Sequence, residues 1–238
     1  MKIQIPEEYQ QQVNNYDSFG YTPEAASSVS SFVNKVYGMM CIALLVTAGS
    51  AWWAIHSLTE AQIATWLWPA MIGELLMVMG LNFLAHRMPK PLAELALIIY
   101  AALNGFTLSI LFLAYTKESI AGAFAVAGGL FGAMSIYGTV TRRDLTTMGS
   151  FCVMALFGLV LAGLVNLFLR SDGLSFVTSV AGVIIFTGLV AYDSQQLRRF
   201  GAADNGQGNL AILAALGLYL DFINLFLYLV RLMGRRRR

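Results

Sequence analysis

Two acidic side chains lie within long apolar segments near the end of the chain. Asp221 and the nearby Asn224 interrupt the run from Leu210 to Met233, and Asp193 directly follows the run Val183–Tyr192. Placing an aspartate at the centre of a membrane helix costs roughly 2.5–3.5 kcal/mol on insertion scales, so such a residue indicates a partner or a function. Two carboxyl groups that share a low-dielectric site cannot both ionise cheaply and compete for one proton. The pattern indicates a proton sensor or a binding point for cations.

The spacing of these residues allows the two carboxyl groups to meet. Asp193 lies eight residues before the connector Gly201–Asn209, and Asp221 lies twelve residues after it. These separations are roughly 12 and 18 Å at 1.5 Å per residue, so antiparallel neighbours would hold both groups at similar depth. Asp221, Asn224 and Tyr228 also recur at helical spacing as one polar stripe, which is predicted to face protein. In the alternative, each carboxylate separately satisfies a helix end, a tyrosine or an arginine.

A third acidic residue, Glu74, lies near the middle of a shorter apolar run that ends at His86 and Arg87. Its carboxyl group either belongs to an ion path or forms a packing hydrogen bond to an Asn or Ser on a facing helix, and the sequence leaves both readings open. Asn104 is one of the amides expected to hydrogen-bond between helices.

The composition places the chain in a membrane. Of 238 residues, 58% are hydrophobic and 12% are charged, whereas about 25% are charged in an ordinary soluble domain. Runs long enough to cross the hydrocarbon are predicted near Val36–Ile55, Leu67–Leu84, Leu92–Tyr115, Ile120–Val140, Gly149–Leu169, Leu174–Leu197 and Leu210–Met233. We therefore predict an all-α integral membrane protein, a seven-transmembrane-helix bundle over residues 35–233.

Polar segments flank the predicted bundle. Residues 1–34 are predicted to form a mobile tail available to membrane protein partners, and residues 234–238 form a basic tail. With seven crossings, eight of the fifteen Lys and Arg residues lie on the N-terminal side and seven on the other. Without the last five arginines the comparison is eight against two, which favours a cytoplasmic N-terminus. The Arg235–Arg238 run favours the same face for the C-terminus. Either the last segment crosses fully or it re-enters, and its length favours full crossing.

Catalysis is not expected. The sequence has no nucleophile and base arrangement, no cofactor fingerprint and no paired-cysteine spacing. The chain is therefore predicted not to be an enzyme, and neither a cofactor nor a nucleic-acid partner is expected.

Several segments together resemble a known family. Ala191–Gln196 and Tyr219–Phe226 resemble the signature of the Bax inhibitor-1 family, the transmembrane Bax inhibitor motif proteins, and Phe131–Ser135 and Thr141–Leu145 resemble its bacterial branch. The resemblance extends from about Asn34 to the C-terminus. It implies a seven-helix bundle in which the last helix is central, and a location in the bacterial inner membrane.

The resemblance also implies roles for individual residues. Asp193 and Asp221 would form the family's paired-aspartate pH sensor, whose protonation controls a calcium leak, and Glu74 matches its acidic position on the second helix. A count from Glu74 places Ala85 where the family has a closing arginine, so Arg87 and His86 are the candidates for a latch. Because Ca²⁺ takes six to eight oxygen ligands, the aspartate pair would be only a weak calcium site in a hydrated passage.

Three functions follow from these observations. The first is a pH-sensitive calcium leak channel, with calcium as the transported ion and the aspartate pair as the gate. The second is a membrane interaction protein that regulates stress responses or membrane proteolysis through its N-terminal tail. The third is a proton-coupled cation exchanger, which differs from a leak because a proton gradient can drive its ion uphill.

Overall fold

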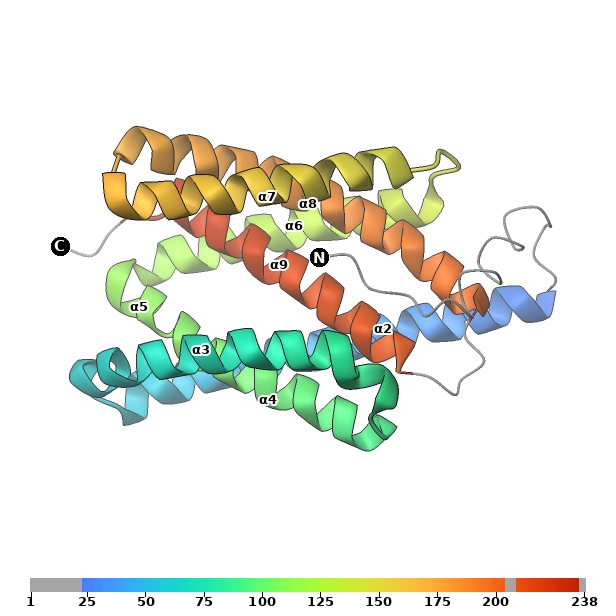
Figure 1. Cartoon of the computed structure of the whole chain (residues 1–238), viewed down its shortest axis with the longest axis horizontal. Coiled ribbons are helices and arrows are strands. Elements are labelled where there is room, and N and C mark those ends of the chain that lie inside the picture. The colour runs from blue at the N-terminus through green and yellow to red at the C-terminus, as the bar shows by residue number, and fades with distance from the viewer. Residues whose placement is uncertain (1–22, 204–208, 236–238) are drawn as a thin grey trace. The chain divides into compact units, whose positions relative to one another are not determined.

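The computed structural model describes residues 23–203 and 209–235, and Figure 1 shows that its elements are helices joined by short connections. The elements, in chain order, are α2 (Pro23–Ser57), α3 (Glu60–Leu84), the 3₁₀ turn η1 (Ala85–Arg87), α4 (Lys90–Leu108), α5 (Ile110–Ala114), α6 (Lys117–Val140), α7 (Thr146–Leu169), α8 (Asp172–Ala203) and α9 (Leu210–Met233).

Seven helical segments among the described residues are long and apolar enough to cross a membrane, with α4 and α5 counted as one. The all-α, seven-span prediction is therefore confirmed, and the chain is a multi-pass integral membrane protein. Helix α9 differs from the others, because 78% of its most apolar stretch is buried whereas the other spans are at most 33% buried. Helix α9 is therefore the most buried of these spans.

Two helices begin well before the apolar runs that predicted them. Helix α2 begins at Pro23, a residue type suited to a first helical turn, so the predicted tail boundary at residue 34 falls inside a helix. Helix α3 begins at Glu60 instead of Leu67 because Thr59 and Gln62 form a capping box, in which the Thr59 amide donates to Gln62 Oε1 at 2.9 Å. Pro69 consequently lies inside α3. Residues 1–22 and 236–238 of the predicted tails lie outside the described residues.

Two further boundaries differ from the prediction. The third span is broken at Ser109, whose buried hydroxyl donates to the Phe106 carbonyl at 2.6 Å and separates α4 from α5. A serine that bonds to nearby backbone in this way competes with the regular helical pattern. Helix α8 continues to Ala203, past the predicted end at Leu197.

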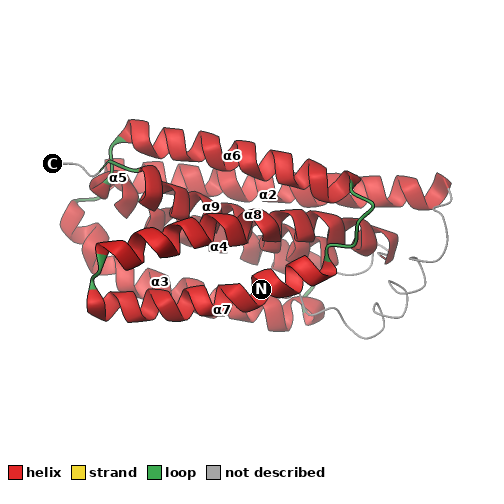
Figure 2. Cartoon of the chain, turned by 90° about the horizontal axis from the view of Figure 1, so that it is seen from above, coloured by secondary structure: helices red, strands yellow, loops and turns green. Residues whose placement is uncertain are grey.

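The described residues fall into two compact units. The α6–α8 unit contains residues 115–196 and 220–235, and the α2–α4 unit contains residues 23–114, 197–203 and 209–219. Helices α8 and α9 thus contribute residues to both units. Figure 2 shows the short loops within each unit in green. Such short connections make consecutive helices antiparallel neighbours.

Close backbone contacts define the packing of the α6–α8 unit. A Cβ atom added at Gly138 of α6 would lie 2.1 Å from the carbonyl oxygen of Ala191 in α8. Similarly, Gly149 of α7 lies against the ring of Tyr192, and Gly182 of α8 lies against the ring of Tyr228. The glycines are required because no side chain fits between these elements. They hold α8, which carries Asp193, close to its neighbours.

In the α2–α4 unit, a glycine likewise allows close contact between α2 and α4. A Cβ atom at Gly105 would lie 2.2 Å from the backbone oxygen of Thr47. At this crossing the Ser50 hydroxyl donates to the carbonyl of Ala102 at 2.6 Å. Backbone and polar side chains of α2 and α4 therefore come within hydrogen-bonding distance.

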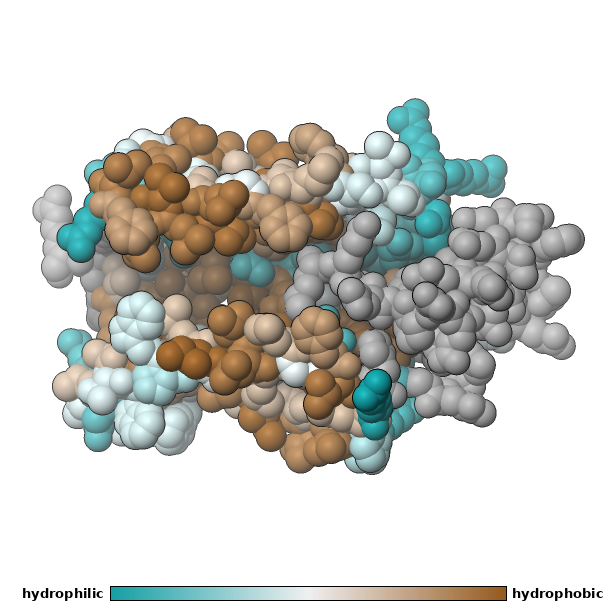
Figure 3. All heavy atoms as spheres, in the orientation of Figure 1, coloured by the Kyte–Doolittle hydropathy of each residue, from teal (hydrophilic) through white to brown (hydrophobic). Residues whose placement is uncertain are grey.

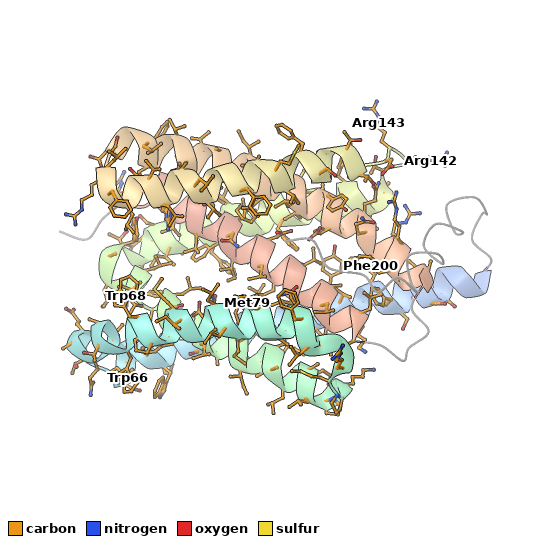
Figure 4. All side chains as sticks on the ribbon, viewed as in Figure 1. Trp66, Trp68, Met79, Arg142, Arg143 and Phe200 are labelled. Carbon is orange, nitrogen blue, oxygen red and sulfur yellow. The ribbon has the colours of Figure 1, made fainter. Side chains whose placement is uncertain are left out.

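The outer faces are apolar. On α7, the exposed side chains include Phe151, Met154, Phe157, Leu161 and Phe168, and Figure 3 shows hydrophobic residues covering this helix and much of α3. Trp66 and Trp68 project from the first half of α3, and Arg142 and Arg143 project from the loop after α6 (Figure 4). Exposed apolar side chains of this kind suit contact with lipid.

The glycine contact at residue 138 can be tested with a matched pair of substitutions in α6. Gly138→Ala should destabilise the protein by about 1–3 kcal/mol, because the added methyl group overlaps the Ala191 backbone. Gly132→Ala is the control, since a Cβ atom there meets nothing within 4 Å. It should be neutral or stabilising by up to about 1 kcal/mol. Thermal unfolding in detergent measures both, and equal midpoints would refute the packing argument.

Candidate proton and cation site

The structure brings Asp193 of α8 and Asp221 of α9 together. Their carboxyl groups lie close enough within the α6–α8 unit to interact directly with each other. Asp221 is only 5% exposed, and its Oδ2 atom is buried and has no donor among the described groups. A carboxylate oxygen can only accept hydrogen bonds, so a bond between two carboxyl groups requires a proton on one of them. The arrangement is therefore suited to holding one shared proton.

The residues next to each aspartate in the chain make contacts of their own with α6. Phe222, next to Asp221, packs edge-to-face against Phe124 and Phe131 of α6, with ring centroids 5.4 and 5.6 Å apart. Ser194, next to Asp193, donates from its hydroxyl to that of Ser135 at 3.2 Å. These contacts fix the residues that flank each carboxyl group. None of these contacts involves a carboxyl group of the pair.

The rest of the predicted polar stripe does not join the pair. The side-chain amide of Asn224 donates to the carbonyl of Leu220 in its own helix at 2.8 Å. Tyr228 stacks on Phe186, with ring centroids 5.8 Å apart, and the guanidinium of Arg231 lies 5.6 Å from the Tyr228 ring centre. Tyr228 thus packs against α8, whereas the printed bond of Asn224 stays within its own helix, so only Tyr228 makes a contact that fits the predicted stripe.

Glu74 lies in the α2–α4 unit, where it accepts two hydrogen bonds from α4. The hydroxyl of Thr107 donates to Oε1 at 2.6 Å, and the side-chain amide of Asn104 donates to Oε2 at 3.3 Å. Tyr219 donates to Asn104 Oδ1 at 3.0 Å and contacts the hydroxyl of Thr47 at 2.7 Å. The alternative that Glu74 bonds to a facing amide matches this geometry. The carboxyl group also lies at one end of a series of hydrogen-bonded side chains.

The candidate latch residues lie in the short turn η1. Arg87 is exposed, and the side chain of His86 lies outside the described atoms. Asn209, the residue before α9, holds this turn, because its side-chain amide donates to the carbonyls of Ala85 at 2.6 Å and Met88 at 2.8 Å. The turn is therefore anchored to the start of the last helix.

Gln195 similarly anchors the loop between α6 and α7. Its side-chain amide donates to the carbonyl of Arg143 at 2.7 Å, and its oxygen accepts from the backbone amide of Leu145 at 2.8 Å. Gln195 is 9% exposed and lies two residues after Asp193. The helix that carries one member of the aspartate pair thus also fixes the loop that carries Arg142 and Arg143.

The aspartate pair supplies few ligands for a metal ion. Within the part of the chain that the structure describes, no group of three or more His, Cys, Asp and Glu side chains is placed to hold one. Two carboxyl groups fall well short of the six to eight oxygens that Ca²⁺ prefers. Any cation at Asp193 and Asp221 would keep much of its water.

Comparison with known proteins shows the family of this chain. A family model described as "Inhibitor of apoptosis-promoting Bax1" matches residues 29–238. The chain belongs to the Bax inhibitor-1 family. The match includes both aspartates, Glu74 and all seven spans, so the resemblance drawn from the short motifs is confirmed.

Bacterial proteins are similar to this chain over most of its length. "Inner membrane protein YbhL" of Escherichia coli (strain K12) is 41% identical over 220 residues, which cover 89% of this chain and 94% of that protein. "Uncharacterized protein RP147" of Rickettsia prowazekii (strain Madrid E) is 45% identical over 216 residues, covering 87% of this chain and 90% of that protein.

Sequence reasoning missed several polar residues of this family member. Thr47, Tyr219, Gln195 and Asn209 make the contacts described above, but each is a common residue type in or beside an apolar helix. Gln195 lies within the family-like segment Ala191–Gln196, and Tyr219 begins the segment Tyr219–Phe226. That placement was the only signal available, and it does not reveal their partners.

Neighbouring glutamines provide a test of the loop anchor. Gln195→Leu should accelerate hydrogen exchange at the Leu145 amide about fivefold to tenfold, because losing a hydrogen bond costs roughly 1 kcal/mol. Gln196→Leu is the control, since Gln196 donates instead to the Tyr192 hydroxyl at 2.7 Å. Exchange mass spectrometry in detergent would show unchanged protection of Leu145 in both variants if Gln195 does not fix the loop.

Proposed function

We propose that the chain is a pH-sensitive calcium leak channel in which Asp193 and Asp221 form the gate. The observation that carries this proposal is the close approach of the two buried carboxyl groups, one on each of two membrane helices. Ionisable groups inside a membrane bundle characteristically mark ion pathways and proton relays. Both residues also lie in the segment that the family model matches.

Protons and cations compete for this pair. When both carboxyl groups are ionised, two negative charges lie in a medium of low dielectric constant, and a cation at the pair relieves their repulsion. Binding of protons neutralises the charge and removes the attraction for the cation. The contacts between α8 and α9 therefore depend on pH, and α9 shifts between a closed and an open arrangement as protons bind.

Calcium passes such a gate as a hydrated ion. Two carboxyl groups cannot replace its water, so the ion is held weakly and leaves quickly. Weak binding favours conduction, because an ion that binds tightly does not leave the pore.

Neutralising either aspartate should remove the pH response. A gate that binds one proton changes its open fraction by up to about tenfold per pH unit. We expect calcium flux into liposomes to rise on acidification with the wild-type protein, because protonation weakens the pairing between the helices and favours the open arrangement of α9. Because an amide does not titrate, flux with Asp193→Asn or Asp221→Asn should depend on pH less than about twofold over the same range. A calcium indicator inside the liposomes measures the rate.

Asp172→Asn is the matched control, because Asp172 lies in the exposed first turn of the same helix as Asp193. It should retain the wild-type response. The gate is wrong if both variants of the pair conduct calcium with an unaltered pH profile.

A proton-coupled exchanger is a second candidate, favoured by the same carboxyl pair because one site could take either a proton or a cation. Liposomes with equal calcium on both sides distinguish the two mechanisms. A proton gradient drives calcium uphill through an exchanger, whereas a leak leaves the concentrations equal.

We also propose that the protein lies in a bacterial inner membrane with a cytoplasmic N-terminus. The printed name of the Escherichia coli relative and the excess of Lys and Arg on the N-terminal side support this. A reporter that is active only in the cytoplasm should be active when fused to the N-terminus and at least about tenfold less active at the C-terminus. Equal activity at both ends would contradict seven full crossings.

A further inference from the structure

A chain of four polar side chains crosses the α2–α4 unit. It runs from Glu74 on α3 through Asn104 on α4 and Tyr219 on α9 to Thr47 on α2, with successive contacts of 3.3, 3.0 and 2.7 Å. Asn104 is 7% exposed, Tyr219 is fully buried and Thr47 is 5% exposed. Each group therefore depends on the others for its hydrogen bonds.

The hydrogen atoms fit this chain in one direction when Glu74 is ionised. The amide of Asn104 donates to the carboxylate, and the hydroxyl of Tyr219 donates to the amide oxygen. Tyr219 has then used its one hydrogen, so Thr47 must donate to Tyr219. The carbonyl oxygens of Ala43 and Ala101 both lie within 3.0 Å of the Thr47 hydroxyl. In this direction of the chain, neither receives the Thr47 hydrogen.

The reverse direction fits equally well when Glu74 carries a proton. The carboxylic acid donates to the amide oxygen of Asn104 after a half-turn of the amide, which exchanges atoms of nearly the same shape. The amide then donates to Tyr219, Tyr219 donates to Thr47, and Thr47 donates to the carbonyl of Ala101 or Ala43. Every group keeps a partner, and one proton from solution has been bound.

We propose that Glu74 is a second proton-binding site, separate from the aspartate pair, and that its protonation reverses the hydrogen-bond chain from Asn104 through Tyr219 to Thr47. The inference goes beyond the proposed function, because it requires neither calcium nor Asp193 and Asp221. In the protonated state the hydroxyl of Thr47 can donate to the Ala101 carbonyl, which adds a bond between α2 and α4.

Few other groups can disturb this site. The titratable side chains that face Glu74 are Tyr100 of α4 and Tyr219 of α9, and both tyrosines are neutral at ordinary pH. Among the described residues, no charged side chain acts on Glu74. Its polar contacts are the hydrogen bonds from Thr107 and Asn104. The proton is therefore the species that changes the charge of this site.

Infrared difference spectra of the full-length protein in liposomes, recorded between acid and alkaline pH, detect the proton directly. A protonated carboxyl group has a C=O stretching band that the carboxylate lacks. We expect one such band to disappear in Glu74→Gln and to persist in the double variant Asp193→Asn with Asp221→Asn. This comparison separates the site from the aspartate pair, whatever the outcome of the flux experiments.

Two further variants test the direction of the chain. Thr47→Val leaves the Tyr219 hydroxyl without an acceptor only in the protonated state, so the midpoint of the band should move about one unit toward lower pH. Thr107→Val removes a donor that is most valuable to the ionised carboxylate, so the midpoint should move about one unit toward higher pH. Ser50→Ala, which removes a different hydrogen bond between α2 and α4, should leave it unchanged.

Opposite shifts from the two threonine variants support the reversible chain, because general damage to the fold would not produce them. The proposal is overturned if no carboxyl band is lost in Glu74→Gln. It is also overturned if the two threonine variants leave the midpoint unchanged or move it in the same direction.

Discussion

Hydrocarbon offers a polar side chain no hydrogen-bonding partner, and this constraint governs the structure of the protein. Each buried carboxyl group must find its partner on another helix. Asp193 and Asp221 find each other, whereas Glu74 finds Thr107 and Asn104. Backbone groups outside the helices obey the same rule. Gln195 hydrogen-bonds to backbone groups of the α6–α7 loop, and Asn209 hydrogen-bonds to backbone carbonyls of the turn after α3. Polar contacts thus specify which helices meet.

These short contacts depend on close helix packing. Gly105 lets the backbone of α4 approach Thr47, one turn from the Ala101 carbonyl that the Thr47 hydroxyl reaches. Gly138 does the same for α6 and Ala191, two residues before Asp193. A methyl group at either position would separate the helices by more than a hydrogen bond tolerates. The glycines at these positions therefore permit the close helix packing on which the polar contacts depend.

The two acidic centres handle protons by different physics. In the aspartate pair, identical groups oppose each other, so the number of bound protons determines whether they attract or repel. In the chain that starts at Glu74, the other members are an amide and two hydroxyl groups that can each donate or accept, so a proton changes the direction of the bonds instead of their number. The pair suits competition between protons and a cation, and the Glu74 chain suits a response to protons alone.

The sequence by itself determined the fold class and much of the candidate site. Apolar runs of about twenty residues permit few structures other than membrane helices, and the cost of burying Asp193 and Asp221 singled them out. Helix starts were less predictable, because a capping box at Thr59 and a proline at position 23 outweighed the apolar pattern. Only the tertiary structure decided the partners of each polar group. Thr47, Asn104 and Tyr219 lie up to 172 positions apart, and one-helix periodicity carries no information on which faces meet.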